Sequence, residues 1–114
     1  MSGHRVLFDL FKAPFEILDP GASGTIIVDR WGAVCNVVTA GAEGRTLAQP
    51  TKSGIRCTVA LKTDGGNLTL TVTGGYNAAS DTDITLSDAG DFVDLVSVQI
   101  GTAYVWRVTG SETA

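Results

Sequence analysis

Histidine and cysteine are scarce in this chain of 114 residues, which has one histidine and two cysteines. A Ser or Cys nucleophile needs a neighbouring base, and the only histidine, His4, is close to the N-terminus, where chains are rarely held in place. Two cysteines without a Cys-x-x-Cys spacing cannot form a structural zinc site alone. The sequence therefore predicts a protein that is not an enzyme and has no cofactor and no metal.

Basic residues are also few, with 8 Lys and Arg against 12 Asp and Glu and a formal net charge of -4. No basic patch interleaved with aromatics is present to neutralise phosphates, which argues against nucleic-acid binding. No apolar run approaches the roughly 18 residues that span a bilayer, and no signal-peptide pattern is present, so we expect no membrane partner and synthesis in a cytosol. In that reducing compartment Cys35 and Cys57, each in an alternating apolar segment, are interpreted as buried free thiols.

Acidic residues gather in one segment, residues 81–94, which has no Lys or Arg. Its carboxylates offer oxygens that calcium accepts, but they lack the spaced ligand loop that makes a calcium motif specific. Aspartates also cap turns and keep strand edges from pairing with other chains, and we favour this interpretation. The aspartates of the segment are Asp81, Asp83, Asp88, Asp91 and Asp94.

Apolar and polar residues alternate with period two from Thr25 onward, in short runs bounded by Gly, Asp, Asn and Pro. This pattern is typical of half-buried strands. It predicts an all-β domain over residues 24–114, a small β-sandwich or jelly-roll of about seven antiparallel strands. The predicted strands are Thr25–Arg30, Ala33–Thr39, Ile55–Lys62, Leu68–Thr73, Ile84–Leu86, Phe92–Ile100 and Ala103–Thr109.

Two connections look like hairpin turns. Gly101-Thr102 fits a type II′ turn, and residues 63–67 (TDGGN) supply residues that tolerate positive φ, so Leu68–Thr73 is expected to run antiparallel to the strand before it. A tight turn is also expected at residues 29–32, with Trp31 covering one end of the core. Trp106 is predicted to lie in the core.

Two regions lack this pattern. Residues 41–54 are too rich in Gly, Pro and small polar residues for a regular element, and a loop of this length suggests binding or assembly, with Arg45, Gln49 and Lys52 as contacts to a partner.

The other region is an N-terminal arm, residues 1–23. It is crowded with large apolar residues, and Pro14 stops any helical turn over Arg5–Lys12. Because exposed apolar groups of this number are unfavourable, the arm must pack on its own domain or on a neighbour, and both stay open. Its anchors are predicted to be Leu7, Phe8, Phe11 and Phe15, since buried aromatics dominate interfaces.

The closing segment Ile84–Thr109, together with the Gly/Thr-rich stretch at residues 66–77 (GNLTLTVTGGYN), resembles the decoration or cement proteins of tailed-bacteriophage capsids. The resemblance covers roughly Gly24–Val108. It implies a non-enzymatic virion protein, made in the host cytoplasm, that binds the outer capsid surface and stabilises contacts between major capsid protein subunits. It also implies a homo-oligomer, with a trimer favoured over a dimer.

A second interpretation is a tail-fibre or receptor-binding module, in which Trp31, Tyr76 and polar loops recognise a glycan by stacking and hydrogen bonding. A small hydrolase ranks last, because nothing in the sequence indicates two carboxylates facing each other across a cleft.

Overall fold

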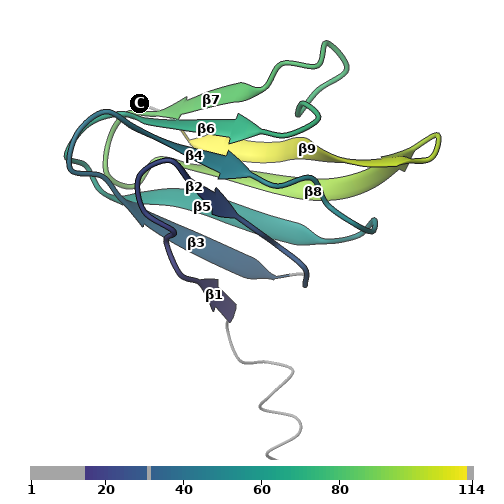
Figure 1. The fold of residues 1–114 in the computed structure, drawn as a ribbon, viewed down its shortest axis with the longest axis horizontal. Coiled ribbons are helices and arrows are strands. Elements are labelled where there is room, and N and C mark those ends of the chain that lie inside the picture. The colour runs from purple at the N-terminus through teal and green to yellow at the C-terminus, as the bar shows by residue number, and fades with distance from the viewer. Residues whose placement is uncertain (1–14, 31, 113–114) are drawn as a thin grey trace, which may run out of the picture.

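The computed structural model describes residues 15–30 and 32–112, and this part of the chain is all-β and contains no helix. It forms two mixed sheets, as Figure 1 shows. The strands are β1 (Phe15–Ile17), β2 (Gly24–Ile26), β3 (Ala33–Val38), β4 (Glu43–Leu47), β5 (Arg56–Thr63), β6 (Leu68–Val72), β7 (Asp83–Leu86), β8 (Phe92–Ile100) and β9 (Ala103–Glu112).

The chain alternates between the two sheets along its first six strands. The five-stranded sheet has the order β1-β3-β5-β8-β9, and the four-stranded sheet has the order β2-β4-β6-β7. Each strand from β3 to β6 lies parallel to the strand two places before it in the sequence. The chain therefore winds back and forth between the sheets. The prediction of an all-β domain is confirmed, whereas the prediction of about seven antiparallel strands was wrong, because the described residues form nine strands and four of their seven pairings are parallel.

Antiparallel pairing is confined to the C-terminal part of the fold. It joins β6 with β7, β5 with β8, and β8 with β9. The β8–β9 hairpin closes through Gly101 and Thr102, with Ile100 opposite Ala103. Gly101 has a φ of 62° and Thr102 is not in the positive-φ region, which confirms the first-position glycine of a type II′ turn.

The connection at residues 63–67 is not a hairpin turn, because β5 and β6 belong to different sheets. Its glycines serve a close approach between two backbones. A Cβ on Gly65 would lie 2.2 Å from the carbonyl oxygen of Thr39, and one on Gly66 would lie 2.3 Å from the carbonyl carbon of Gly41. The turn expected at residues 29–32 likewise connects the two sheets, and Trp31 lies outside the described residues.

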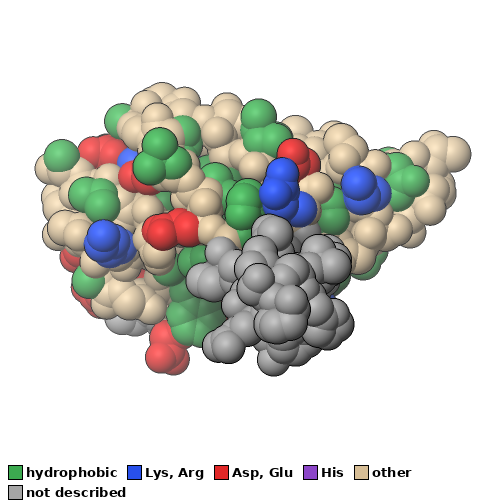
Figure 2. All heavy atoms as spheres, turned by 90° about the horizontal axis from the view of Figure 1, so that it is seen from below, with side chains coloured by type: hydrophobic (Ala, Val, Ile, Leu, Met, Phe, Trp, Pro, Cys, Tyr) green, Lys and Arg blue, Asp and Glu red, His purple; other side chains and the backbone are tan. Residues whose placement is uncertain are grey.

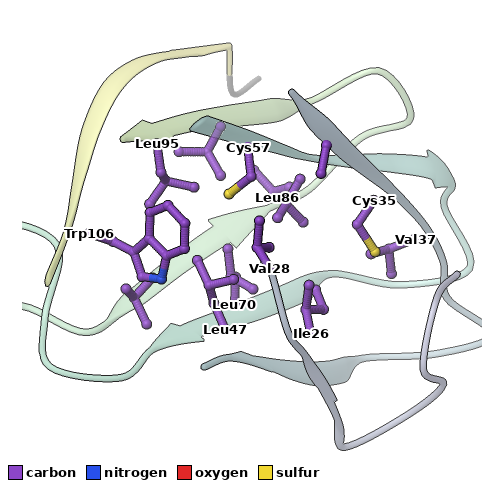
Figure 3. Packing of buried hydrophobic residues seen from close by; sticks show 14 of the residues in the cluster. Ile26, Val28, Cys35, Val37, Leu47, Cys57, Leu70, Leu86, Leu95 and Trp106 are labelled. Carbon is purple, nitrogen blue, oxygen red and sulfur yellow. The ribbon is translucent and has the colours of Figure 1, made fainter. Parts of the chain in front are cut away.

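One buried cluster draws on both sheets (Figure 3). On β6, Leu68, Leu70 and Val72 are buried, while the intervening threonines lie on the other face. Trp106 is 0% exposed, and its indole Nε1–H donates to the carbonyl oxygen of Ala48 at 2.9 Å, so its predicted place in the core is confirmed. Period-two alternation produces this core because successive side chains of a strand point to opposite faces.

Candidate interaction surface

Phe15 belongs to the fold rather than to a free arm. It lies in β1, at the edge of the five-stranded sheet, where it pairs with Ala33 of β3. Its partly buried ring packs against the core cluster, and the guanidinium carbon of Arg30 lies 4.8 Å from the ring centroid. Arg30 over the ring adds a cation–π contact, worth about 0.5–1 kcal/mol at an exposed site. The folded domain therefore includes residues that were assigned to the arm.

A buried arginine fixes the chain just after β1. Arg45 is 2% exposed, and its Nε–H donates to Oδ1 of Asp19 at 2.7 Å while Nη2 donates to Oδ2 at 3.1 Å. The Nη1 group donates to Glu43 at 3.0 Å, and Nη2 also reaches the carbonyl oxygen of Val38. A two-pronged contact between guanidinium and carboxylate is among the strongest side-chain hydrogen bonds. We call Asp19, Glu43 and Arg45 the clasp.

The clasp shifts the ionisation of its carboxylates. The hydrogen bond from Arg45 lowers the pKa of Asp19 to about 2, burial acts in the opposite direction, and the backbone N–H groups of Val38 and Gly21 lower it further. The N–H of Ala40 and the guanidinium of Arg45 also lower the pKa of Glu43. Both carboxylates are therefore ionised at neutral pH, and their negative charges balance the positive charge of the buried Arg45.

The residues predicted to contact a partner do not gather at one place. Arg45 is buried and holds the fold together, so it has almost no surface to offer a partner. It lies in β4, and this strand is part of residues 41–54, the segment expected to be an irregular loop. Gln49 and Lys52 are exposed, and Gln49 donates its Nε2 to the carbonyl oxygen of Tyr104 at 2.9 Å. Three further predicted anchors, Leu7, Phe8 and Phe11, lie outside the described residues.

Exposed apolar side chains near β1 were missed by the sequence analysis. Leu18 is 89% exposed and Val38 is 46% exposed. The N–H of Val38 donates to Oδ2 of Asp19, the residue after Leu18, at 3.0 Å. Leu18 follows directly on Ile17, which packs against the core, and successive side chains of an extended chain point to opposite faces.

The acidic segment caps turns, as the sequence suggested. The carboxylate of Asp91 accepts the N–H groups of Ser87 and Asp88 at 2.9 Å and 3.0 Å. Asp81 and Asn77 bridge the loop before β7 through two hydrogen bonds. Within residues 15–30 and 32–112, no group of three or more His, Cys, Asp and Glu side chains is arranged to hold a metal ion.

Cys35 and Cys57 are free and buried, as predicted. Burial, the largest cause, raises the pKa of Cys35 to about 11 and that of Cys57 to about 12. Figure 3 shows both sulfur atoms within the apolar cluster. A thiol with so high a pKa is a poor nucleophile, because the thiolate is the reactive form.

On the face in Figure 2, Lys and Arg side chains stand apart from one another, with acidic and apolar groups between them. In the described part of the chain, no helix is long and apolar enough to cross a membrane.

Comparisons with protein-family models and with curated proteins find no match to this chain.

Proposed function

We propose that this chain is a non-enzymatic structural virion protein that binds the outer surface of a phage capsid and stabilises contacts between major capsid protein subunits. In this proposal the two sheets form a sandwich-like platform, and the apolar segment before β1 contacts the capsid. The protein acts as a homo-oligomer, with a trimer favoured.

The observation that carries the proposal is the anchoring of β1. The segment before Phe15 contains Val6, Leu7, Phe8, Leu10 and Phe11. Strand pairing with β3 holds the end of this segment on one side, and the clasp holds the chain after β1 on the other. A firmly held base lowers the entropy cost of placing a binding segment against a partner.

Binding to an assembled capsid stabilises it by mass action. A ligand that binds only the intact lattice contributes RT ln(1 + [L]/Kd), about 2.7 kcal/mol per site at a hundredfold excess over Kd. Adding the protein to bare expanded heads is therefore expected to raise their resistance to heat, and the protein is expected to co-sediment with them. Unchanged head stability at saturating protein would contradict the proposal.

The test variant replaces Leu7 and Phe11 together with Ala, because truncating a central apolar anchor at an interface typically costs about 2 kcal/mol or more. Phe15 is left in place, since its ring also packs against the core of its own domain. The matched control is Ile27→Ala, an exposed apolar residue beyond β2. The double variant should lose most of the protection while the control retains it. Binding to host cells or to a purified glycan, without any effect on heads, would favour the receptor-binding module instead.

A further inference from the structure

A groove of about 330 Å³ separates the free edge of β7 from that of β9. These strands end their respective sheets, so each has a hydrogen-bonded neighbour on one side only within the described residues. Val93 at the groove is buried in the core, and Ile84 packs against the core. The groove is lined by Tyr76, Asp83, Ile84, Thr85, Val93, Val108 and Ser111.

The wall formed by β7 presents backbone hydrogen-bonding groups to the groove. The N–H of Val72 donates to the carbonyl oxygen of Thr82 at 2.7 Å, which makes these residues a hydrogen-bonded pair. Bonded and non-bonded pairs alternate along antiparallel strands, so Asp83 and Thr85 stand in non-bonded pairs with β6. Their backbone groups point away from β6, and the hydroxyl of Tyr76 already reaches the carbonyl oxygen of Asp83 at 3.4 Å.

The wall formed by β9 also presents backbone hydrogen-bonding groups to the groove. The two-residue turn makes Ile100 and Ala103 the closing hydrogen-bonded pair of the hairpin. Bonded and non-bonded pairs alternate from Ile100–Ala103 along the hairpin. Tyr104 and Val108 therefore stand in non-bonded pairs with β8, and their backbone groups point away from β8. The bond from Gln49 to the carbonyl oxygen of Tyr104 agrees with this orientation. The carbonyl oxygens of Asp83 and Tyr104 already accept from Tyr76 and Gln49, so an extended chain lying in the groove would find its backbone partners at Thr85 on one side and at Val108 on the other.

We propose that residues 5–12 of a second copy of this chain add a β-strand between β7 and β9. The segment RVLFDLFK alternates so that Val6, Phe8 and Leu10 share one face. That face would cover Ile84 and Val108 in the groove. Strand addition to an exposed sheet edge is a recurring mode of peptide recognition, in which backbone bonds give affinity and alternate side chains give specificity.

Charge supports the same occupant. The segment is flanked by Arg5 and Lys12, whereas the groove rim carries Asp83, and Glu112 follows close behind Ser111. Opposite charges at the rim favour correct docking and speed association, although each exposed pair adds little affinity.

The length of the chain keeps Leu10 out of the groove of its own molecule. β1 and β9 lie at opposite edges of the five-stranded sheet, four strand spacings or about 19 Å apart. The five residue steps from Phe15 back to Leu10 span at most about 18 Å when fully extended. Leu10 therefore cannot reach the groove of its own molecule, so a segment that fills the groove from residue 5 to residue 12 must come from a second copy. The proposal concerns assembly of the protein alone and holds whether or not the capsid is its partner.

Sedimentation equilibrium of the full chain tests the groove. The wild-type chain is expected to self-associate, and Val108→Arg, which places a charged side chain in the groove, should weaken association at least about tenfold, as loss of a central contact does. Ile100→Arg is the matched control, because Ile100 is an exposed apolar residue of the same hairpin that does not line the groove. A monomeric wild-type chain, or equal effects of both variants, would overturn the proposal.

The pattern of side chains tests the strand. Phe8→Ser with Leu10→Ser removes the face that points into the groove, whereas Leu7→Ser with Phe11→Ser removes the opposite face. Only the double variant at Phe8 and Leu10 should abolish self-association. A helical segment would place Leu7 and Phe11 on one face instead, because residues four apart lie together on a helix, so the reverse result would refute strand addition.

Cross-linking tests exchange between copies and does not depend on how Val108→Arg folds. A mixture of the Leu10→Cys and Ser111→Cys variants should form a disulfide-linked heterodimer under mild oxidation. Cys35 and Cys57 are buried and should not compete. The proposal fails if no heterodimer forms. It also fails if one chain carrying both substitutions forms the disulfide within itself at high dilution.

Discussion

Asp19 accepts two hydrogen bonds from the guanidinium of Arg45, at 2.7 Å and 3.1 Å, although the two residues lie 26 positions apart. Asp19 belongs to the connection after β1, and Arg45 belongs to β4 of the other sheet. Arg45 in turn donates to the carbonyl oxygen of Val38, the last residue of β3. The Arg45 side chain thus connects β4 with the segment after β1 and with the end of β3.

Breaking the clasp should destabilise the fold strongly. Asp19→Ala leaves the cation of Arg45 buried without its main partner, and removing one member of a buried ion pair costs about 3 kcal/mol or more. Asp29→Ala is the matched control, since Asp29 and Arg30 form an exposed pair at 3.6 Å, and such pairs contribute about 1 kcal/mol at most. Urea denaturation measures both variants. Similar losses in the two would show that the clasp has no special role.

The clasp also predicts acid sensitivity. The pKa of Asp19 falls from its usual 3.8 to about 2 on folding, so the unfolded chain takes up a proton first as the pH is lowered. The stabilising contribution is therefore fully present above about pH 5, and it is lost as the pH falls through the folded pKa of about 2. The lowered pKa of Glu43 acts in the same direction. Urea midpoints measured from pH 2 to pH 7 should fall toward acid, and Asp19→Asn should flatten that slope.

Period-two alternation located most of the strands but not their partners. It placed β3, β5, β6, β7, β8 and β9 correctly to within a few residues, because burial of one face of a strand requires this alternation. The strand predicted over Thr25–Arg30 is too long, because β2 ends at Ile26. Alternation carries no information about which strand lies alongside which. The Asp-Gly-Gly-Asn link looked like a hairpin turn because the same residues serve any place where backbones approach closely.

The clasp could not be predicted for a different reason. The run EGRTL of β4 is short and carries two charges, so it resembles a loop, and its partner carboxylate lies far away in the sequence. The groove between β7 and β9 likewise depends on which strands end the sheets. The residues around Arg45, β7 and β9 in the sequence do not show which distant carboxylate pairs with Arg45 or which strands end the sheets.

Gly65 should not tolerate a side chain. A Cβ there would lie 2.2 Å from the carbonyl oxygen of Thr39, so the crossing from β5 to β6 would have to shift. Gly65→Ala should lower the free energy of unfolding by about 3 kcal/mol, as severe overpacking does. Gly41→Ala is the control, because the added Cβ meets nothing within 4 Å and Gly41 does not have a positive φ. Thermal and urea unfolding of both variants would decide this, and a stable Gly65→Ala would contradict the packing described above.

Cys35 and Cys57 should react slowly with a thiol reagent in the native state. Both are buried, and their raised pKa values leave almost no thiolate at neutral pH. Thr102→Cys, in the exposed turn of the β8–β9 hairpin, supplies a control thiol that should be labelled at once. Labelling of the two native cysteines should begin only when denaturant opens the fold. Labelling as fast as that of the control thiol would show that the core is accessible.

Two truncations should separate the segment before β1 from the folded domain. Removing residues 1–14 leaves β1 and the clasp in place, so circular dichroism and urea unfolding should stay near those of the full chain at a concentration at which the full chain is monomeric. Removing residues 1–20 also deletes Phe15, which packs against the core, and Asp19, which compensates the buried cation of Arg45. The longer truncation should therefore lose about 3 kcal/mol or more of stability, the cost expected when a buried charge loses its main partner. Self-association should disappear already in the shorter truncation, because the strand proposed to enter the groove is missing. Equal stability of the two truncated chains would mean that β1 contributes nothing to the fold.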